Sequence, residues 1–373
     1  MKHRIPLRAL VALALALLAA CGEAQPVAEL PTLPPQATPI PQPTVDRARL
    51  GPELRMFNWQ DYIDPQVLAD FQAEYGVRVT LETYQSNEEL LVRLEENPGV
   101  YDLVVPGAFM ADQLRERGML APLDRTAIPN LEHVGLVYQR TWSDPQGSYC
   151  APYMWGPSGV AYNSDLVAEP TSWGALLNPV PALHGKVSLL DDQREVLGAA
   201  LRYLGYSVNS ASADELSRAQ TLLAQNASHI RYTSDTDAIV DGLVSGELAI
   251  AHIWPGIALQ AAARQPSIRY VIPREGTAMW QDCMAVTRDA PNPYAAHLFI
   301  NFLNRPEVAA RNATSLKYAT TNTTAFPLLP PELKNSPALY PDPEVMLRLE
   351  RVRPLGPVQQ RYDRAWSELR QQR

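Results

Sequence analysis

Between Leu54 and Pro106 the chain reads LRMFNWQDYIDPQVLADFQAEYGVRVTLETYQSNEELLVRLEENPGVYDLVVP. Short runs of β-forming residues alternate there with longer amphipathic runs, which predicts strands and helices in the order β-α-β-α-β. Two helix starts are signalled, by Asp64-Pro65 and by the capping-box pattern from Ser86 to Glu89. This rhythm predicts an α/β sheet. The expected elements are 54–59, 64–75, 77–84, 87–95 and 101–106.

A second series of alternating runs extends from Lys186 to Leu303, so we expect two α/β lobes. The tail, 343–371, is predicted to be largely helical, with breaks at Arg353-Pro354 and Gly356-Pro357. Ligands of open α/β sheets bind beyond the carboxyl ends of the strands, and a site is expected at those ends. The elements of the second series are 186–190, 194–204, 215–225, 238–245, 248–254, 268–272, 284–287 and 294–303.

Residues 1–20 form a targeting signal. Basic residues precede an uncharged apolar run of 12 residues, Ala9 to Ala20, whereas spanning a bilayer takes roughly 20. The run ends in Leu18-Ala19-Ala20-Cys21, which resembles the bacterial lipobox. We therefore predict a lipoprotein signal peptide that is cleaved before a lipidated Cys21.

A proline-rich stretch follows the signal. Residues 21–50 contain many prolines and no periodic apolar face, which predicts a semi-extended tether. The folded body is expected to begin near Pro52. This order predicts a protein of the periplasm or cell surface that is anchored to a membrane through Cys21.

Composition and motifs exclude several classes of function. After residue 20 the chain carries 29 basic and 40 acidic residues, a formal charge of −11, which disfavours nucleic acid as a partner. Three cysteines and six scattered histidines show no metal-ligand spacing, so neither a metal nor a cofactor is expected. Nucleophile-elbow, phosphate-loop and Cys-x-x-Cys motifs are absent from the sequence, which indicates a protein that is not an enzyme.

Aromatic residues stand beside carboxylates at several expected strand ends. Ring faces attract cations by about 0.5–2 kcal/mol each, and a carboxylate adds a charge-assisted hydrogen bond. The pattern therefore favours a cationic amine as ligand. The residues concerned are Trp59, Gln60, Asp61, Tyr62, Asp191, Asp192, Glu195, Trp254, Trp280, Gln281, Asp282 and Tyr318.

Each of these residues has an alternative role. Asp192 and Glu195 stand at N-cap and N3 spacing and could simply cap a helix. The three tryptophans could be core residues. Asp282 enters an apolar run, where a carboxylate needs a partner, which favours a functional role. Asp61 and Glu88 are expected to be solvated charges at helix starts.

Seven short motifs, taken in their order and spacing, resemble those of the bacterial periplasmic spermidine/putrescine-binding proteins, the solute receptors of polyamine ABC transporters. The resemblance extends from Leu54 to Leu369. The motifs are FNWQDY (57–62), TYQSNE (83–88), YDLVVP (101–106), PYMWG (152–156), DQREV (192–196), WQD (280–282) and LYPD (339–342).

The resemblance implies an α/β, two-lobed type II periplasmic-binding-protein fold. It places two crossings between the lobes, at Cys150–Gly156 and at Trp280–Met284. Cys150 and Cys283 fall on these crossings, so a disulfide near the hinge and a pair of free thiols both stay open. The expected lobes are 52–156 with 282–326, and 157–281 with 327–373.

The resemblance also implies a ligand set. Where spermidine-preferring relatives are expected to present polar residues, this chain has Gly107, Phe109 and Val352, and Ile257 replaces an aspartate of putrescine-preferring relatives. Three carboxylates match a triamine better than a diamine, which favours spermidine over putrescine. The implied contacts are the rings Trp59, Tyr62, Trp254, Trp280 and Tyr318, the carboxylates Asp192, Glu195 and Asp282, and the side chains of Gln60 and Phe109.

The sequence thus predicts a monomeric lipoprotein that captures a polyamine between two lobes and delivers it to a membrane ABC permease. A receptor for another cationic or amino-acid-derived solute is one alternative. A sensory role and a hydrolase that shares the two-lobed frame are others, although no nucleophile with an adjacent base is visible for the latter.

Overall fold

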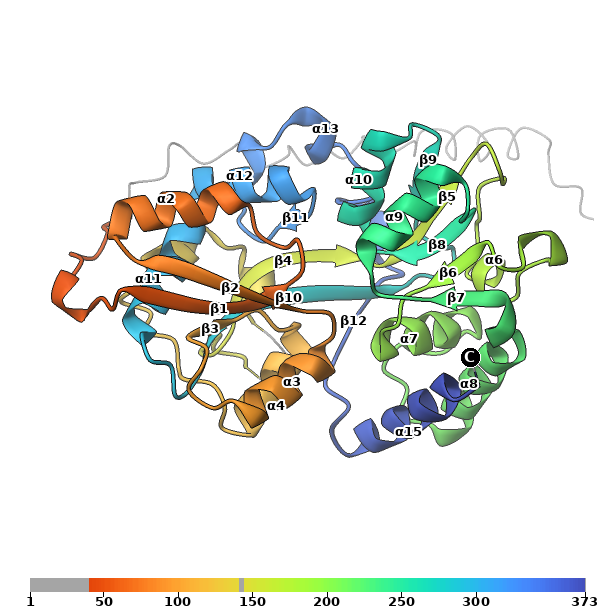
Figure 1. Ribbon diagram of the computed structural model, residues 1–373, viewed down its shortest axis with the longest axis horizontal. Helices are drawn as coiled ribbons and strands as arrows, with labels where there is room; N and C mark the ends of the chain where they lie inside the picture. Colours follow the sequence, from red (N-terminus) through yellow and green to blue (C-terminus); the bar gives the residue numbers. More distant parts are fainter. Residues whose placement is uncertain (1–39, 141–143, 373) are drawn as a thin grey trace, which may run out of the picture. The chain divides into compact units, whose positions relative to one another are not determined.

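The computed structural model describes residues 40–140 and 144–372, which fold around two β-sheets (Figure 1). We call each sheet with its covering helices a lobe. The strands of the first sheet, in spatial order, are β11 (Ala319–Thr320), β4 (Ala151–Pro157), β10 (Ala278–Val286), β3 (Leu103–Val104), β1 (Glu53–Trp59) and β2 (Arg78–Tyr84), with β12 (Glu350–Arg351) beside β10. Those of the second are β7 (Ile230–Tyr232), β6 (Val187–Leu189), β8 (Ile250–Ile253), β5 (Gly159–Asn163) and β9 (Ile268–Val271).

Helices cover both faces of the first sheet (Figure 1). Leu54 and Met56 of β1 pack with the helices of one face, whereas Phe57 packs with those of the other, as strand alternation requires. The helices of the first face are α2 (Pro65–Tyr75), α11 (Pro293–Leu303) and α12 (Pro306–Leu316). Those of the second are α3 (Asn87–Glu96) and α4 (Ala108–Glu116).

Both predicted helix starts near the amino end are confirmed. Asp64 caps α2 by accepting a hydrogen bond from the Gln66 amide, and Pro65 occupies the first turn. Ser86 caps α3 by accepting from the Glu89 amide, while the Glu89 carboxylate accepts from the Gln85 amide. The loops before these helices therefore have fixed directions at the ends of β1 and β2.

The second lobe is built around the fully buried Trp173 and the apolar faces of its helices. These helices are α6 (Gly174–Leu177), α7 (Gln193–Tyr203), α8 (Ala213–Asn226), α9 (Thr236–Ser245), α10 (Pro255–Arg264) and α15 (Gln359–Arg370). The shorter helices of the molecule are α5 (Leu136–Gln139), α13 (Pro331–Lys334), α14 (Pro343–Met346), η1 (Arg47–Arg49), η2 (Pro129–His133), η3 (Pro181–Leu183), η4 (Ala227–His229), η5 (Phe326–Leu328) and η6 (Gly356–Val358). None of the helices in the described ranges is long and apolar enough to cross a membrane.

Two paired strands carry the chain between the sheets. Strands β4 and β10 lie side by side, antiparallel, with Trp280 opposite Gly156 (Figure 1). The chain leaves the first sheet just after β4, at Ser158, and returns just before β10. The two motifs expected at the crossings therefore lie in these strands, next to the points where the chain changes sheet.

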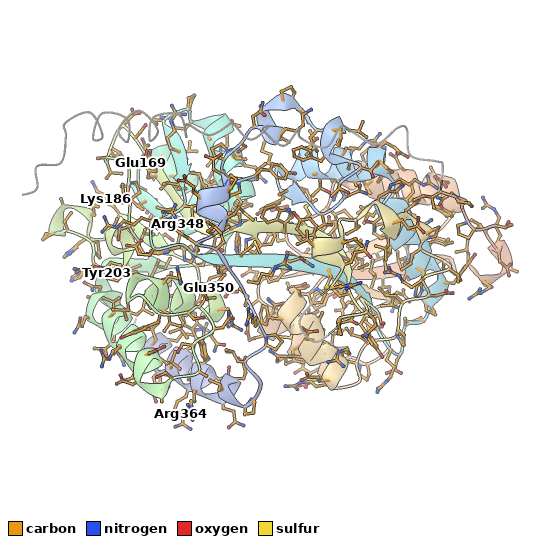
Figure 2. All side chains as sticks on the ribbon, turned by 180° about the vertical axis from the view of Figure 1, so that it is seen from behind. Glu169, Lys186, Tyr203, Arg348, Glu350 and Arg364 are labelled. Atoms are coloured by element: carbon orange, nitrogen blue, oxygen red, sulfur yellow. A yellow bond between two sulfur atoms is a disulfide. The ribbon has the colours of Figure 1, made fainter. Side chains whose placement is uncertain are left out.

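The tail differs from the prediction in its first half. Its helices are α14, the short η6 and α15, and β12 lies between α14 and η6, since Glu350 and Val352 donate backbone hydrogen bonds to Thr277 and Met279. Glu350, labelled in Figure 2, ties this strand to the second lobe because its carboxylate accepts from Arg202 (2.5 Å) and Ser207 (2.6 Å). After β12 the chain enters the second lobe.

Part of the segment expected in the second lobe lies on the first lobe instead. Leu329 packs in the first-lobe core, and the Tyr340 hydroxyl accepts a hydrogen bond from the Thr320 amide of β11. Contacts distant in sequence decide this placement.

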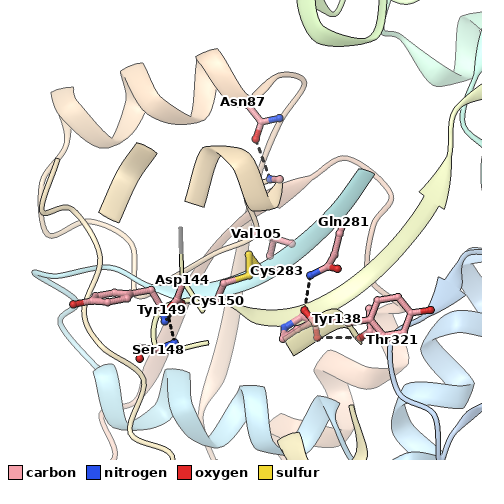
Figure 3. Close-up of a disulfide and its surroundings, with 12 residues drawn as sticks. Asn87, Val105, Tyr138, Asp144, Ser148, Tyr149, Cys150, Gln281, Cys283 and Thr321 are labelled. Atoms are coloured by element: carbon pink, nitrogen blue, oxygen red, sulfur yellow. Dashed lines mark hydrogen bonds between the residues drawn. A yellow bond between two sulfur atoms is a disulfide. The ribbon is translucent and has the colours of Figure 1, made fainter. Parts of the chain in front are cut away.

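The disulfide joins Cys150 to Cys283 inside the first lobe (Figure 3). Their Cα atoms lie 5.3 Å apart, and both residues pack with Phe57 in the core beneath α3 and α4. The expected position near the hinge is wrong, because the half of β10 that contains Cys283 continues into the pairing with β3.

The described chain packs on the first lobe from Gln42 onward. The Gln42 side-chain amide donates to Asn130 (2.7 Å), and Arg47 donates to the Glu74 carbonyl (3.2 Å). The body therefore begins before Pro52, and the last residues assigned to the tether belong to it. The predicted signal peptide and Cys21 lie outside the described residues.

Candidate ligand-binding site

A cavity of about 470 Å³ is lined by residues of both lobes. Its size is within the range usual for small-molecule sites. All ten side chains that the sequence suggested as ligand contacts line it, namely Trp59, Gln60, Tyr62, Phe109, Asp192, Glu195, Trp254, Trp280, Asp282 and Tyr318. The structure thus brings together residues that are up to 259 positions apart, from 59 to 318.

The first lobe contributes Trp59, Tyr62 and Asp282. Trp59 ends β1, and its indole N–H donates to the Val105 carbonyl (2.9 Å), which fixes the ring. The Tyr62 hydroxyl donates to Asp282 Oδ2 (2.8 Å). Asp282 is 8% exposed, so its predicted need for a partner inside an apolar strand is met by this tyrosine.

The second lobe contributes Asp192 and Glu195 from the start of α7. Asp192 Oδ1 accepts from the backbone amides of Arg194 (2.8 Å) and Glu195 (3.0 Å), so the capping role is confirmed. Both cap bonds go to one oxygen, which leaves Oδ2 unused for capping. Glu195 Oε1 accepts from the Trp254 indole (3.2 Å). Capping and ligand binding are therefore compatible in Asp192.

Two glycines make room for the rings of the cavity wall. A Cβ on Gly156 would lie 2.7 Å from the Trp280 ring, and one on Gly256 would lie 2.5 Å from the Tyr318 ring. Trp280 and Tyr318 meet edge to face with centroids 5.5 Å apart. At Gly156 and Gly256 the backbone therefore lies closer to these rings than it could if either residue had a side chain.

Burial makes Asp192 and Asp282 hard to ionise. Burial, together with the negative charges of Glu88 and Glu195, raises the pKa of Asp192 to about 8. Burial also raises the pKa of Asp282 to about 8, although the hydrogen bond from Tyr62 acts to lower it. Among the described residues, no side-chain nitrogen of a lysine or arginine lies within 4.0 Å of a carboxylate oxygen of Asp192, Glu195 or Asp282. A cation that enters the cavity would supply the missing countercharge.

A bound cation is therefore expected to release about one to two protons at pH 7, because it favours the ionised forms of Asp192 and Asp282. Affinity should rise with pH up to about 8. Calorimetry at pH 7 in phosphate and in Tris would measure the release, since the two buffers differ in protonation heat. Observed heats that do not depend on the buffer would contradict it.

The same shifts affect the ligand-free fold. A carboxyl group whose folded pKa lies above its unfolded value of about 4 stabilises the fold at low pH, and this contribution is lost as the pH rises toward 8. The double variant Asp192→Asn/Asp282→Asn is the matched control for the ligand-free fold, because it should remove this part of the pH dependence of stability.

The comparisons with known proteins agree with this geometry. Residues 66–341 match the family described as bacterial extracellular solute-binding proteins. The chain belongs to this family. The spermidine/putrescine-binding periplasmic protein of Escherichia coli K12 is 34% identical over 321 residues, which cover 85% of this chain and 91% of that protein.

Solved structures of other solute-binding proteins share the fold. The spermidine/putrescine ABC transporter substrate-binding protein of Streptococcus pneumoniae is 31% identical, with a TM-score of 0.72, over 86% of this chain and 99% of that one. A lipoprotein of Treponema pallidum is 26% identical, with a TM-score of 0.75, over 85% and 99%. These matches confirm the resemblance seen in the motifs and the two-lobed fold.

Arg194 is a cavity residue of this solute-binding protein that the sequence did not predict. It is 4% exposed, and it donates to the Arg353 carbonyl and to Asn209 Oδ1, both at 2.9 Å. Its guanidinium lies 5.1 Å from the Phe109 ring, so Phe109 contacts the second lobe as well as lining the cavity. The motif DQREV contained Arg194, but its partners lie in distant segments.

Two acidic residues differ in their surroundings, although both were expected to be solvated. Asp61 is exposed, as expected, at the rim of the cavity, with a positive φ of 52°. Glu88 is half-buried, and burial raises its pKa, so the expectation of a solvated charge is wrong for this residue. Within the described residues no cluster of histidine, cysteine or acidic side chains could hold a metal ion.

Proposed function

We propose that the protein is an extracytoplasmic solute-binding lipoprotein that captures a polyamine between its lobes, with spermidine preferred to putrescine. One observation carries the proposal: Asp192, Glu195 and Asp282 are buried in one ring-lined cavity, without a lysine or arginine partner among the described residues. Ammonium groups satisfy buried carboxylates by charge-assisted hydrogen bonds, and ring faces attract the remaining positive charge.

The preference for spermidine rests on charge matching. A triamine offers one ammonium group to each of the three carboxylates, whereas a diamine leaves one carboxylate buried without a cation. The proposal has four further parts. The protein delivers its ligand to an ABC permease, it is located in the periplasm or at the cell surface, it catalyses no reaction, and it is a monomer. The solute-binding functions of the relatives support such a role here, and the lipobox-like end at Cys21 supports a lipid anchor.

Titration calorimetry tests the proposal on full-length protein in detergent, refolded from denaturant to remove carried-over ligand. Spermidine is expected to bind one-to-one and at least about tenfold more tightly than putrescine, a difference of about 1.4 kcal/mol. Leucine, which has no net charge, should give no heat of binding. Equal affinity for the two amines would overturn the preference for spermidine but not polyamine capture. If neither amine binds, polyamine capture itself is overturned.

Arg351 favours a second candidate, a cationic solute that also carries an acidic group. Its guanidinium lines the cavity, donates to Gln281 Oε1 (3.3 Å) and to the Val137 carbonyl (3.1 Å), and has no carboxylate partner among the described residues. An amino-acid-derived amine could place its carboxylate there. Tighter binding of γ-aminobutyrate or arginine than of spermidine in the same titrations would favour this candidate.

A further inference from the structure

His252 is a buried histidine beneath the ligand cavity. It lies in β8, its side chain is fully buried, and neither ring nitrogen has a hydrogen-bond partner among the described residues. Leaving a buried polar group unpaired destabilises the fold, so buried side-chain nitrogens nearly always have partners. The imidazole therefore needs a polar neighbour that can approach it.

Glu195 is that neighbour. Its Oε2 lies 3.5 Å from His252 Nε2, and this oxygen also has no hydrogen-bond partner among the described residues. The two unpaired atoms thus face each other just beyond the usual hydrogen-bond distance, and a shift of a few tenths of an ångström would join them. The other oxygen, Oε1, already accepts from the Trp254 indole.

The surroundings of His252 fix the direction of its ring. Trp173 packs edge-on against the imidazole with centroids 4.8 Å apart, and the Trp173 indole is itself held by the Gly276 carbonyl (2.9 Å). His252 and Trp254 are two residues apart along one extended segment, so both can reach the same carboxylate. One donor is then available for each oxygen of Glu195.

We propose that His252 is a positioning residue: its imidazole donates Nε2–H to Glu195 Oε2 and holds the carboxylate in the orientation that accepts the ligand's ammonium group. The affinity part rests on the proposed function, because it assumes an amine at Glu195. A carboxylate held by two donors loses less conformational freedom when the ligand arrives. Glu195 keeps its remaining lone pairs for the ammonium group.

Four variants of the full-length protein test this role with spermidine as the probe. His252→Met has a similar volume but no donor, and it should bind spermidine about 3- to 10-fold more weakly. His252→Gln, whose amide can donate from nearly the same place, should restore the affinity to within about twofold. When Glu195 is already replaced by alanine, adding His252→Met should change the affinity by less than about twofold.

A merely structural histidine gives a different pattern. His252→Met would then weaken binding equally with and without Glu195, or His252→Gln would fail to restore it. Either result would overturn the proposal, as would unchanged affinity in His252→Met. Thermal unfolding of each variant shows whether it is folded.

A second readout needs neither ligand nor a His252 variant. The ¹⁵N shifts of the imidazole should show the Nε2–H tautomer in the ligand-free wild type and should change in Glu195→Ala. A Nδ1–H tautomer, or ¹⁵N shifts that are the same in the wild type and in Glu195→Ala, would overturn the contact between His252 and Glu195. If spermidine fails to bind wild type, polyamine capture fails, while this spectrum still decides whether His252 holds Glu195.

Discussion

Replacing Asp282 by asparagine is expected to weaken spermidine binding by about 100- to 4000-fold. Breaking a buried ion pair costs about 3–5 kcal/mol, and each 1.4 kcal/mol is a factor of ten in affinity. The substitution removes the charge but keeps an oxygen that can accept from Tyr62, whose hydroxyl now donates to Asp282 at 2.8 Å. Titration calorimetry with spermidine at pH 8, where about half of the Asp282 side chains are ionised before the ligand binds, measures the effect.

Asp61→Asn is the matched control for this prediction. Asp61 also lines the cavity, but it is exposed at the rim, where a charge contributes less than about 1 kcal/mol. Its positive φ of 52° suits asparagine as well as aspartate. We expect a loss of less than about fivefold. Equal losses in the two variants would mean that only the overall charge of the cavity matters, which would contradict the assigned role of Asp282.

Removing the disulfide by the double substitution Cys150→Ala/Cys283→Ala is expected to lower the free energy of unfolding by about 2–5 kcal/mol. The two cysteines are 133 residues apart, and opening so long a loop restores much conformational freedom to the unfolded chain. The bond also lies in the first-lobe core, where both side chains are almost fully buried. Urea unfolding of the variant and the wild type measures the difference.

Reducing agent gives the control for the disulfide. It should destabilise the wild type by an amount similar to that of the double substitution, and it should leave the double variant unchanged. A wild type whose unfolding midpoint is the same with and without reductant in the unfolding buffer would contradict the prediction.

Local signals in the sequence were sufficient for the elements near the amino end. Strand β1 and helices α2 and α3 begin and end within about one residue of their expected bounds, because Asp64, Ser86 and the apolar spacing act within a few residues. Strand β12 could not be predicted in this way. Its strand conformation depends on pairing with β10, which lies some seventy residues earlier in the chain.

The candidate site shows the same division. Motifs that resemble those of polyamine-binding proteins predicted the side chains that line the cavity, and the capping pattern of Asp192 was visible locally. The contacts of Phe109 with Arg194 and of His252 with Glu195 were not predictable, because they join elements distant in sequence. The disulfide was expected near the hinge for a related reason. Cys283 is close in sequence to a crossing between the lobes, but the sequence does not show that the half of the strand with Cys283 lies inside the first lobe.

A crystal structure of the protein with spermidine would show whether the three carboxylates bind the amine. We expect the amine inside the cavity, with ammonium nitrogens about 2.7–3.2 Å from oxygens of Asp192, Glu195 and Asp282 and with the alkyl chain against the tryptophan rings. Spermidine bound outside the cavity, or inside it without contact to these three carboxylates, would overturn polyamine capture by this site.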